Sequence, residues 1–191
     1  MKDIIIKGFK ESADLKTIFI EENVDKLISV IEITAGAIQQ GNKVILFGNG
    51  GSAADAQHIA AEFVNRFLIE RPPLPALALT TDTSIITSIG NDMDFSEIFA
   101  KQIRALGKMD DVAMGLSTSG NSINVVKAFQ VANEMGIKTV GITGKDGGKI
   151  SGAVDYLLNV DSYSTPRIQE VHITIGHMIC EMVDLLLFGR K

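Results

Sequence analysis

Two of the chain's three histidines stand near side chains that suit acid–base or metal chemistry. His58 and Glu62 are four positions apart in a stretch with helical spacing, so their side chains share one helix face. His177 follows Gln169 in a second helical stretch, and the two lie about 80° apart around an ideal helix. Two imidazoles, a carboxylate and an amide suit either a tetrahedral zinc site or an acid–base pair. Sequence alone does not bring the two helices together, so a structural role for each histidine is the alternative.

A glycine-rich turn leads into the first of these helices. It reads Gly48-Asn49-Gly50-Gly51-Ser52 and follows the apolar segment 43–47. Glycines let the backbone approach a ligand closely, and a helix N-terminus attracts anions. We expect Ser52 to cap the helix. The same turn is a weak dinucleotide signal, because the acidic residue usual about 20 positions later is missing.

A second loop of the same kind follows the apolar segment 111–116. It reads Ser117-Thr118-Ser119-Gly120-Asn121-Ser122 and leads into a helical stretch. Four hydroxyl groups at a helix N-terminus can surround phosphate oxygens. The alternative is a capping loop, with Asn121 or Ser122 as the cap, although one cap needs only one hydroxyl. We expect residues 80–84 and Asn91-Asp92 to face the same cleft.

Strands alternating with helices must position these groups. We predict one domain, residues 1–191, made of a helical oligomerisation arm over 1–41 and an α/β core over 42–191. The core is a three-layer αβα sandwich with a five-stranded parallel sheet, which binds ligands beyond the carboxyl ends of its strands. The arm packs either on its own domain or on a partner chain. The predicted strands are 43–47, 74–79, 111–116, 138–142 and 154–160, and the helices lie near 52–69, 95–106, 122–135 and 165–188, with a turn near 146–151.

Composition narrows the classes of function. The formal net charge is −5 with no run of basic residues, which argues against nucleic-acid binding. Cys180 is the only cysteine, so no intrachain disulfide can form. The first residues have too short an apolar run for a signal peptide, and no stretch has the length of a membrane span. We expect a cytoplasmic protein with no membrane association.

Three stretches together resemble the phosphoheptose isomerase family, also called sedoheptulose 7-phosphate isomerases, a branch of the sugar isomerase (SIS) fold. They are residues 48–62, 117–122 and 169–177. The resemblance implies a flavodoxin-like sheet order and conversion of sedoheptulose 7-phosphate to D-glycero-D-manno-heptose 7-phosphate. It implies a step in heptose biosynthesis for bacterial surface glycans, lipopolysaccharide or capsule. It also implies a homotetramer with N-terminal helices in a central bundle and sites near subunit interfaces.

The resemblance further assigns residues to roles. One zinc ion per subunit is expected at His58, Glu62, Gln169 and His177. Substrate contacts are expected at Asn49, Gly50, Gly51, Glu62, Asn91, Asp92, Ser117, Thr118, Ser119, Ser122 and Gln169. Moving a carbonyl between neighbouring carbons through an enediol needs a base and an acid. We assign Glu62 as the base, His177 as the general acid or proton shuttle, and Asp92 as an aid to ring opening. Zinc ligation would compete for the lone pairs of Glu62 and His177.

Three other functions fit part of the sequence. A non-catalytic SIS-domain protein that senses phosphosugars or binds a replication initiator would keep the serine-rich loop and the arm. It would not need Glu62, Gln169 and His177 together. An isomerase for a different phosphosugar would share all of these residues. A nucleotide-binding domain of similar topology would lack the second phosphate-type loop.

Overall fold

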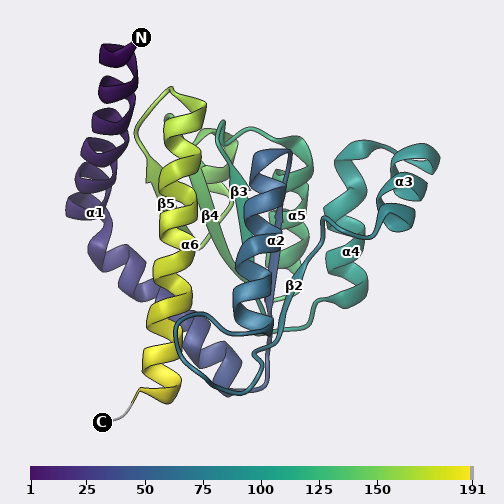
Figure 1. The fold of residues 1–191 in the computed structure, drawn as a ribbon. Coiled ribbons are helices and arrows are strands. Elements are labelled where there is room, and N and C mark those ends of the chain that lie inside the picture. The colour runs from purple at the N-terminus through teal and green to yellow at the C-terminus, as the bar shows by residue number, and fades with distance from the viewer. Residues whose placement is uncertain (190–191) are drawn as a thin grey trace.

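The computed structural model describes residues 1–189 and shows a parallel sheet between two layers of helices (Figure 1). The predicted three-layer α/β sandwich is confirmed. Its strands follow the order β2-β1-β3-β4-β5, and every neighbouring pair is parallel. Residues 190–191, which end the predicted core, lie outside the described residues. The strands are β1 (Val44–Gly48), β2 (Ala76–Ala78), β3 (Val112–Ser117), β4 (Lys138–Gly144) and β5 (Tyr156–Val160).

The helices divide between the two faces of the sheet. One face is covered by α1, α2 and α6, and the other by α4 and α5 (Figure 1). Alternate strand residues point to opposite faces, so Leu46 packs on the first side and Phe47 on the second. The helices are α1 (Lys2–Gln39), α2 (Gly51–Val64), α3 (Thr83–Asp92), α4 (Ile98–Leu106), α5 (Ile123–Glu134) and α6 (Thr165–Phe188), with 3-10 turns η1 (Phe95–Glu97) and η2 (Gly148–Gly152).

The helix α6 has the length and apolar composition of a membrane span. It nevertheless lies between α1 and α2 on the sheet (Figure 1). Val171, Ile175 and Ile179 are buried there against the other layers. Part of the apolar surface of α6 is therefore used in packing against the sheet and the neighbouring helices.

Two predicted elements were wrong in their bounds, and one helix was not predicted. The helix predicted over 52–69 ends at Val64, and residues 65–75 are irregular. The strand predicted over 74–79 keeps only Ala76–Ala78, because the prolines before it lack N–H groups for a ladder. The helix α3 was not predicted, although Asp82 caps it by accepting a hydrogen bond from Ile85 N at 2.9 Å.

The order of the strands determines where a ligand can bind. The chain starts at β1, adds β2 on one side of it and then β3 on the other. The order in which strands are added therefore switches sides at β1, while all strands stay parallel. In open parallel sheets the crevice at this reversal point, beyond the carboxyl ends of the strands, is where ligands bind. The loops after β1 and β3 are residues 49–51 and 117–122. Both predicted anion-binding loops therefore lie at one edge of the sheet.

Candidate active site

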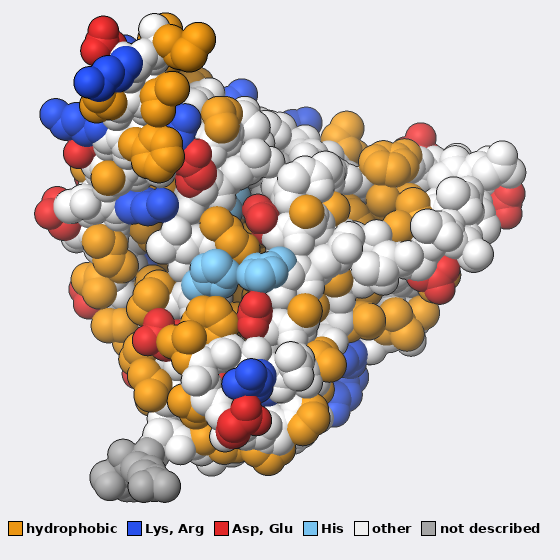
Figure 2. All heavy atoms as spheres, in the orientation of Figure 1, with side chains coloured by type: hydrophobic (Ala, Val, Ile, Leu, Met, Phe, Trp, Pro, Cys, Tyr) orange, Lys and Arg blue, Asp and Glu red, His pale blue; other side chains and the backbone are white. Residues whose placement is uncertain are grey.

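The first group of site residues lies where α2 and α6 meet. The two helices run side by side in the same direction, so that Gly176 of α6 packs on Ile59 of α2. His58 and His177 meet across this contact, with their Nε2 atoms 3.0 Å apart. Figure 2 shows two histidines adjacent on this face, with acidic side chains on either side. One Nε2 must donate and the other accept, because both atoms belong to a single short contact.

Glu62 joins the histidine pair from one turn further along α2. Its Oε1 lies 3.4 Å from His58 Nε2, and its side chain is 22% exposed. The predicted i, i+4 contact on one helix face is therefore present. The ring of Phe67, which lies in the irregular segment after α2, stacks on His177 of α6. The ring centroids are 5.4 Å apart and the interplanar angle is 24°. The histidine thus has a carboxylate-linked imidazole on one side and an apolar face on another.

Asp55 is a site residue that sequence reasoning missed. Burial raises the pKa of its carboxyl group, and the nearby charges of His58 and His177 partly offset that rise. Its Oδ2 atom is buried and has no hydrogen-bond partner among the described residues. A spacing signal existed, since Asp55, His58 and Glu62 follow the i, i+3, i+7 pattern of one helix face.

Zinc requires nitrogen, sulfur or oxygen ligand atoms at a defined spacing. Zinc–nitrogen bonds of about 2.0–2.1 Å set neighbouring tetrahedral ligands about 3.3 Å apart. The histidine nitrogens at 3.0 Å are close to that spacing, and Glu62 supplies a carboxylate beside them. Within residues 1–189, however, no three His, Cys, Asp or Glu side chains form a ready metal cluster. The histidine pair therefore fits as part of a zinc site that needs further movement or further ligands.

Gln169 lies at the other end of the helix pair. Its side-chain amide covers Gly51 so closely that a Cβ added there would meet Nε2 at 2.3 Å. Gly51 precedes His58 by seven helical residues, about 10 Å along the helix axis. The structure thus brings Gln169 to the predicted substrate loop rather than to the histidines. Its assignment as a zinc ligand stays a prediction.

The serine-rich loop gathers its hydroxyl groups as predicted for an oxyanion cradle. Ser117 Oγ lies 3.0 Å from Ser122 Oγ and 3.5 Å from Ser119 Oγ. Ser122 occupies the N-cap position of α5, but its side chain makes no capping hydrogen bond. Its hydroxyl group is therefore directed to the cluster instead of the helix, which favours the binding interpretation of this loop. Thr118 lies in the same loop, half-buried.

The turn after β4 holds the serine-rich loop in place. Ile150 N donates to Gly120 O at 3.0 Å, and Lys149 N donates to Asn121 Oδ1 at 3.1 Å. Gly120 has φ +64° and packs so tightly that a Cβ would meet Gly147 O at 2.1 Å. The turn at residues 147–150, which carries no recognisable sequence motif, therefore supports the serine-rich loop.

A reciprocal pair of amides ties the two anion-type loops together. Asn49 Nδ2 donates to Asn124 Oδ1 at 2.9 Å, and Asn124 Nδ2 donates back to Asn49 Oδ1 at 2.8 Å. Asn49 and Gly50 also line a small hollow of about 150 Å³ with Thr80, which follows β2. Of the residues 80–84 that were expected to face the cleft, Thr80 lines this hollow beside the glycine-rich turn. Asn124 was not singled out by sequence, because its importance depends on a partner 75 positions away.

Two predictions do not join this group in the structure. Asn91 and Asp92 are exposed at the end of α3, and Asn91 Nδ2 donates to Asp92 Oδ1 at 2.8 Å. Figure 1 shows α3 on the far side of α4 from α2 and α6. The predicted N-cap Ser52 was wrong: Gly50 holds that position with φ 55°, and Ser52 is buried in the first turn.

Comparison with known proteins identifies the family. The family model for the SIS domain matches residues 9–144. The phosphoheptose isomerase of Thermodesulfovibrio yellowstonii is 53% identical over 98% of this chain and 94% of its own. That of Aquifex aeolicus is 52% identical over the full length of both.

Solved structures agree with the sequence relatives. The phosphoheptose isomerase from Neisseria gonorrhoeae superposes with a TM-score of 0.91 at 42% identity, covering 96% of this chain and 98% of its own. The one from Francisella tularensis gives 0.92 at 37% identity, covering 95% and 97%. These matches extend through α1 as well as the sheet. The chain belongs to the phosphoheptose isomerases, a family of aldose–ketose isomerases within the SIS-domain fold.

Proposed function

We propose that this chain converts sedoheptulose 7-phosphate to D-glycero-D-manno-heptose 7-phosphate, with Glu62 as base and His177 as acid. One observation carries the assignment of residues: the glycine-rich turn that opens α2 is tied through Asn49 and Asn124 to the start of α5, beside the serine-rich loop, and the acid–base cluster lies further along α2. Gly51 begins the helix and His58 lies about 10 Å further along it. A substrate that is anionic at one end and reactive at the other suits such an arrangement.

The length of the open-chain substrate is close to the axial distance between Gly51 and His58. An open-chain heptose carries its phosphate on carbon 7 and its carbonyl at carbon 2. With bonds of about 1.5 Å, an extended chain puts the phosphorus about 8–9 Å from carbon 2. A phosphate at Ser117, Ser119 and Ser122, beside the N-terminus of α5, would leave the other end of the sugar to reach toward the histidines. The backbone N–H groups at the start of that helix favour the anion.

The acid–base cluster suits an enediol mechanism. Glu62 takes a proton from carbon 1, and the electron pair of that bond forms the carbon–carbon double bond. His177 gives a proton to the oxygen on carbon 2, which completes the enediol. Glu62 then returns its proton to carbon 2, and His177 takes the proton from the oxygen on carbon 1, which forms the aldehyde. His58 Nε2 contacts both His177 and Glu62 and therefore orients the two side chains.

Zinc is part of this proposal. His58, Glu62, Gln169 and His177 would hold the ion once the Gln169 side chain has moved away from Gly51, and Glu62 and His177 would leave it before they transfer protons. The ion would supply positive charge to polarise sugar oxygens. A direct test measures zinc binding by calorimetry with wild type and the double variant His58→Asn/His177→Asn. Equal affinity in both proteins would contradict this site.

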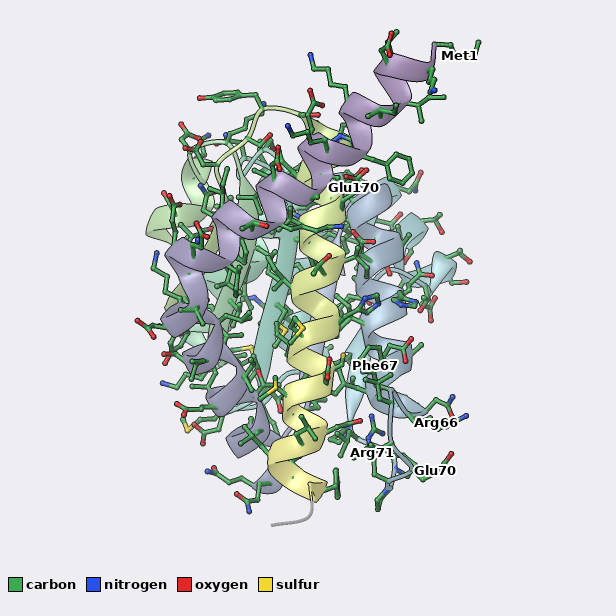
Figure 3. All side chains as sticks on the ribbon, turned by 60° about the vertical axis from the view of Figure 1, so that its left-hand side comes forward. Met1, Arg66, Phe67, Glu70, Arg71 and Glu170 are labelled. Atoms are coloured by element: carbon green, nitrogen blue, oxygen red, sulfur yellow. The ribbon has the colours of Figure 1, made fainter. Side chains whose placement is uncertain are left out.

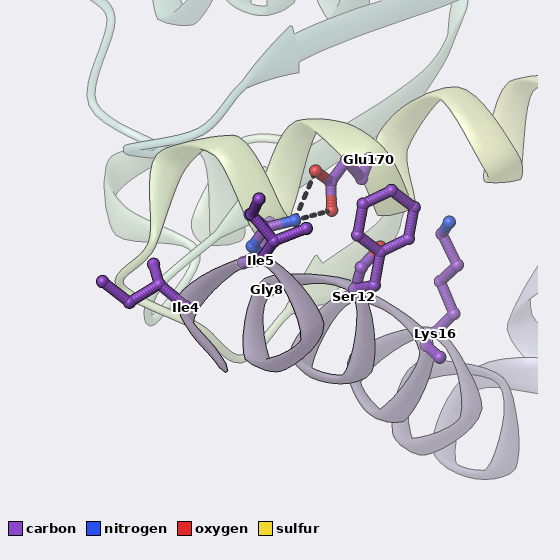
Figure 4. A pocket seen from close by; sticks show the side chains of 9 residues that line it. Ile4, Ile5, Gly8, Ser12, Lys16 and Glu170 are labelled. Carbon is purple, nitrogen blue, oxygen red and sulfur yellow. Dashed lines mark hydrogen bonds and ion pairs between the residues drawn. The ribbon is translucent and has the colours of Figure 1, made fainter. Parts of the chain in front are cut away.

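A homotetramer built on the arm is also proposed. Several apolar residues along α1 are exposed, including Phe9 at 79% and Ile4 at 76%. Together with Ile5 they line a hollow of about 650 Å³ between α1 and the start of α6 (Figure 4). Its wall carries the Arg167–Glu170 ion pair, and the pKa of Glu170 is lowered by a hydrogen bond from Ser12 and by Arg167. An exposed apolar surface of this kind marks an interface.

The product is proposed to supply heptose for a bacterial surface glycan, lipopolysaccharide or capsule, made in the cytoplasm. The presence of Glu62, Gln169 and His177 favours an enzyme over a sensing or scaffolding protein. The family relationship points the same way.

The decisive experiment is proton NMR of sedoheptulose 7-phosphate with the protein in D2O. An aldoheptose phosphate with deuterium on carbon 2 would support the enediol mechanism. Loss of turnover on chelation and recovery with zinc would support the metal. Saturable binding without turnover would contradict the enzymatic proposal and favour a phosphosugar-sensing protein.

A further inference from the structure

Arg71 lies outside every motif in the sequence, yet its side chain is almost completely buried. It belongs to the irregular segment that follows α2, and only 1% of its side chain is exposed. Figure 3 labels it beside the C-terminal half of α6, below Phe67. Burying a guanidinium group costs free energy unless its N–H groups form hydrogen bonds. The hydrogen-bond partners of Arg71 therefore indicate its role.

One side of the guanidinium group binds the end of α2. Its Nη2 donates to Glu62 O at 2.8 Å, and its Nη1 donates to Phe63 O at 2.7 Å and Asn65 O at 3.2 Å. The last carbonyl groups of a helix have no partner within the helix. A cation at this end also suits the helix dipole. Arg71 therefore fixes the turn that carries Glu62.

The other side of the group binds α6. Arg71 Nε donates to Asp184 Oδ1 at 2.8 Å, and the Asp184 side chain is 3% exposed. Asp184 follows His177 by seven residues, two helical turns along nearly the same face. Cys180 lies between them, and burial together with the charges of Glu62 and Asp184 raises the pKa of its thiol to about 12. Because the thiol is neutral, it adds no negative charge to this junction, where Arg71 pairs with Asp184.

We propose that Arg71 and Asp184 form a positioning pair that sets the spacing of Glu62, His58 and His177 by joining the ends of their helices. The proposal rests on the acid–base roles given above. The histidine contact joins α2 and α6 at 3.0 Å. The two residues are 119 positions apart in the chain, so the packing of the two helices has to hold them together. Within residues 1–189, Arg71 is the side chain outside the two helices whose hydrogen bonds reach both of them. Catalytic groups misplaced by about 1 Å can lose a hundredfold in rate.

A role confined to stability predicts different kinetics. Loss of stability alone lowers the amount of folded enzyme without changing kcat per folded site or KM. Loss of positioning lowers kcat and leaves KM nearly unchanged, because the serine-rich loop and Asn49 lie at the sheet edge. The ratio of the two effects therefore separates the explanations.

The test uses Arg71→Lys and the paired variant Arg71→Met/Asp184→Leu. Lysine keeps the charge but carries its donors on a single nitrogen, so it cannot reproduce the separate positions from which Arg71 Nε, Nη1 and Nη2 bind Asp184, Phe63 O and Glu62 O. The paired variant leaves no unpaired buried charge, which keeps the protein folded if the single change does not. Lys43→Met is the control, because Lys43 forms an ion pair with buried Asp111 at the opposite end of the strands. Thermal unfolding shows whether each variant is folded, and its particle mass in solution shows whether it assembles as the wild type does.

We expect kcat to fall at least about tenfold in Arg71→Lys and in the paired variant, with KM within about twofold. A second control, Arg104→Lys, changes an exposed ion pair between α4 and α5 on the other face of the sheet and leaves no buried charge unpaired. It should keep both constants. A crystal structure of the paired variant should show the two histidine Nε2 atoms beyond hydrogen-bond distance. Unchanged kcat in both folded variants, or an unchanged histidine contact, would overturn the proposal. Absence of turnover in wild type would count against the proposed function instead, and the crystal structure would still decide the positioning role.

Discussion

The Nε2 atoms of His58 and His177 lie 3.0 Å apart although 119 positions separate the two residues in the chain. The contact joins two parallel helices at the middle of their shared length. It also converts two ordinary histidines into a pair in which one ring donates and the other accepts. The expected effects of changing the site follow from this contact.

Replacing His177 with glutamine should lower kcat at least about a hundredfold, the usual scale for a lost acid or base. The amide keeps polar atoms at the position but cannot transfer a proton near neutral pH. The control is His172→Gln, five residues earlier on the same helix, where the side chain faces the interior. Similar losses in both variants would show that α6 is merely sensitive to substitution.

Glu62→Gln should keep the fold and lose at least about a hundredfold in turnover, because an amide cannot accept the carbon-bound proton. The measurement is steady-state kinetics combined with deuterium incorporation at carbon 2. Glu70→Gln serves as the matched control, since Glu70 pairs with Arg66 in an exposed position. Near-normal turnover in Glu62→Gln would remove Glu62 from the role of base.

Ser119→Ala should weaken phosphosugar binding about tenfold, as expected for one lost hydrogen bond to a charged group, and affect kcat less. The hydroxyl group stands in the cluster with Ser117 and Ser122. Ser29→Ala, on the exposed side of α1, is the control. A dissociation constant that stays the same would mean that the loop is only structural.

Asp55→Asn should lower kcat by about 10–100-fold, the range seen when a group that supports a catalytic imidazole is lost. Its carboxylate lies near both histidines, and its Oδ2 makes no hydrogen bond to any residue that the structure describes. Asparagine keeps the shape but removes the charge. The activity should be compared with that of Asp25→Asn, an exposed position on α1. If the two variants behave alike, Asp55 has no part in the reaction.

His172 should make the fold sensitive to acid. Burial lowers its pKa from 6.5 to about 4, and its Nε2–H donates to Thr143 O at 2.9 Å. Between these pKa values the unfolded chain binds the proton and the folded chain does not, so stability falls as pH drops below 6.5. The loss from this group is about 2 kcal/mol at pH 5.

Urea unfolding at pH 7.5 and pH 5 tests the role of His172. The difference in unfolding free energy between the two pH values should shrink by about 2 kcal/mol in His172→Gln. The glutamine amide can still donate to Thr143 O. An equal pH dependence in wild type and variant would show that other groups cause the acid sensitivity.

Much of the fold could be predicted because its signals are local. Apolar strands such as 44–47 and the long helix 165–188 are visible within a short window of sequence. The helix α3 was missed because its capping signal at Asp82 is followed by threonine, serine and isoleucine, which form helices only weakly. The prolines before β2 shortened a strand that its apolar residues had suggested.

The site was predictable where residues on one element share a face, as His58 and Glu62 do. Contacts between elements were not predictable from spacing. Asn124 and Arg71 carry no motif, and their value depends on partners 75 and 113 positions away. The position of Gln169 against Gly51 is a further case, because only the relative placement of α2 and α6 determines it.

The placement of His177 and Asp184 on the last helix has a consequence for synthesis on the ribosome. The serine-rich loop is held by the turn at residues 147–150, and the histidine contact needs His177 of α6, so neither part of the proposed site is complete until most of the domain has been made. Domains generally fold as units, and α6 contributes buried residues to the main apolar core of this one. The proposed site of a nascent chain therefore forms in one step, after α6 has left the ribosome.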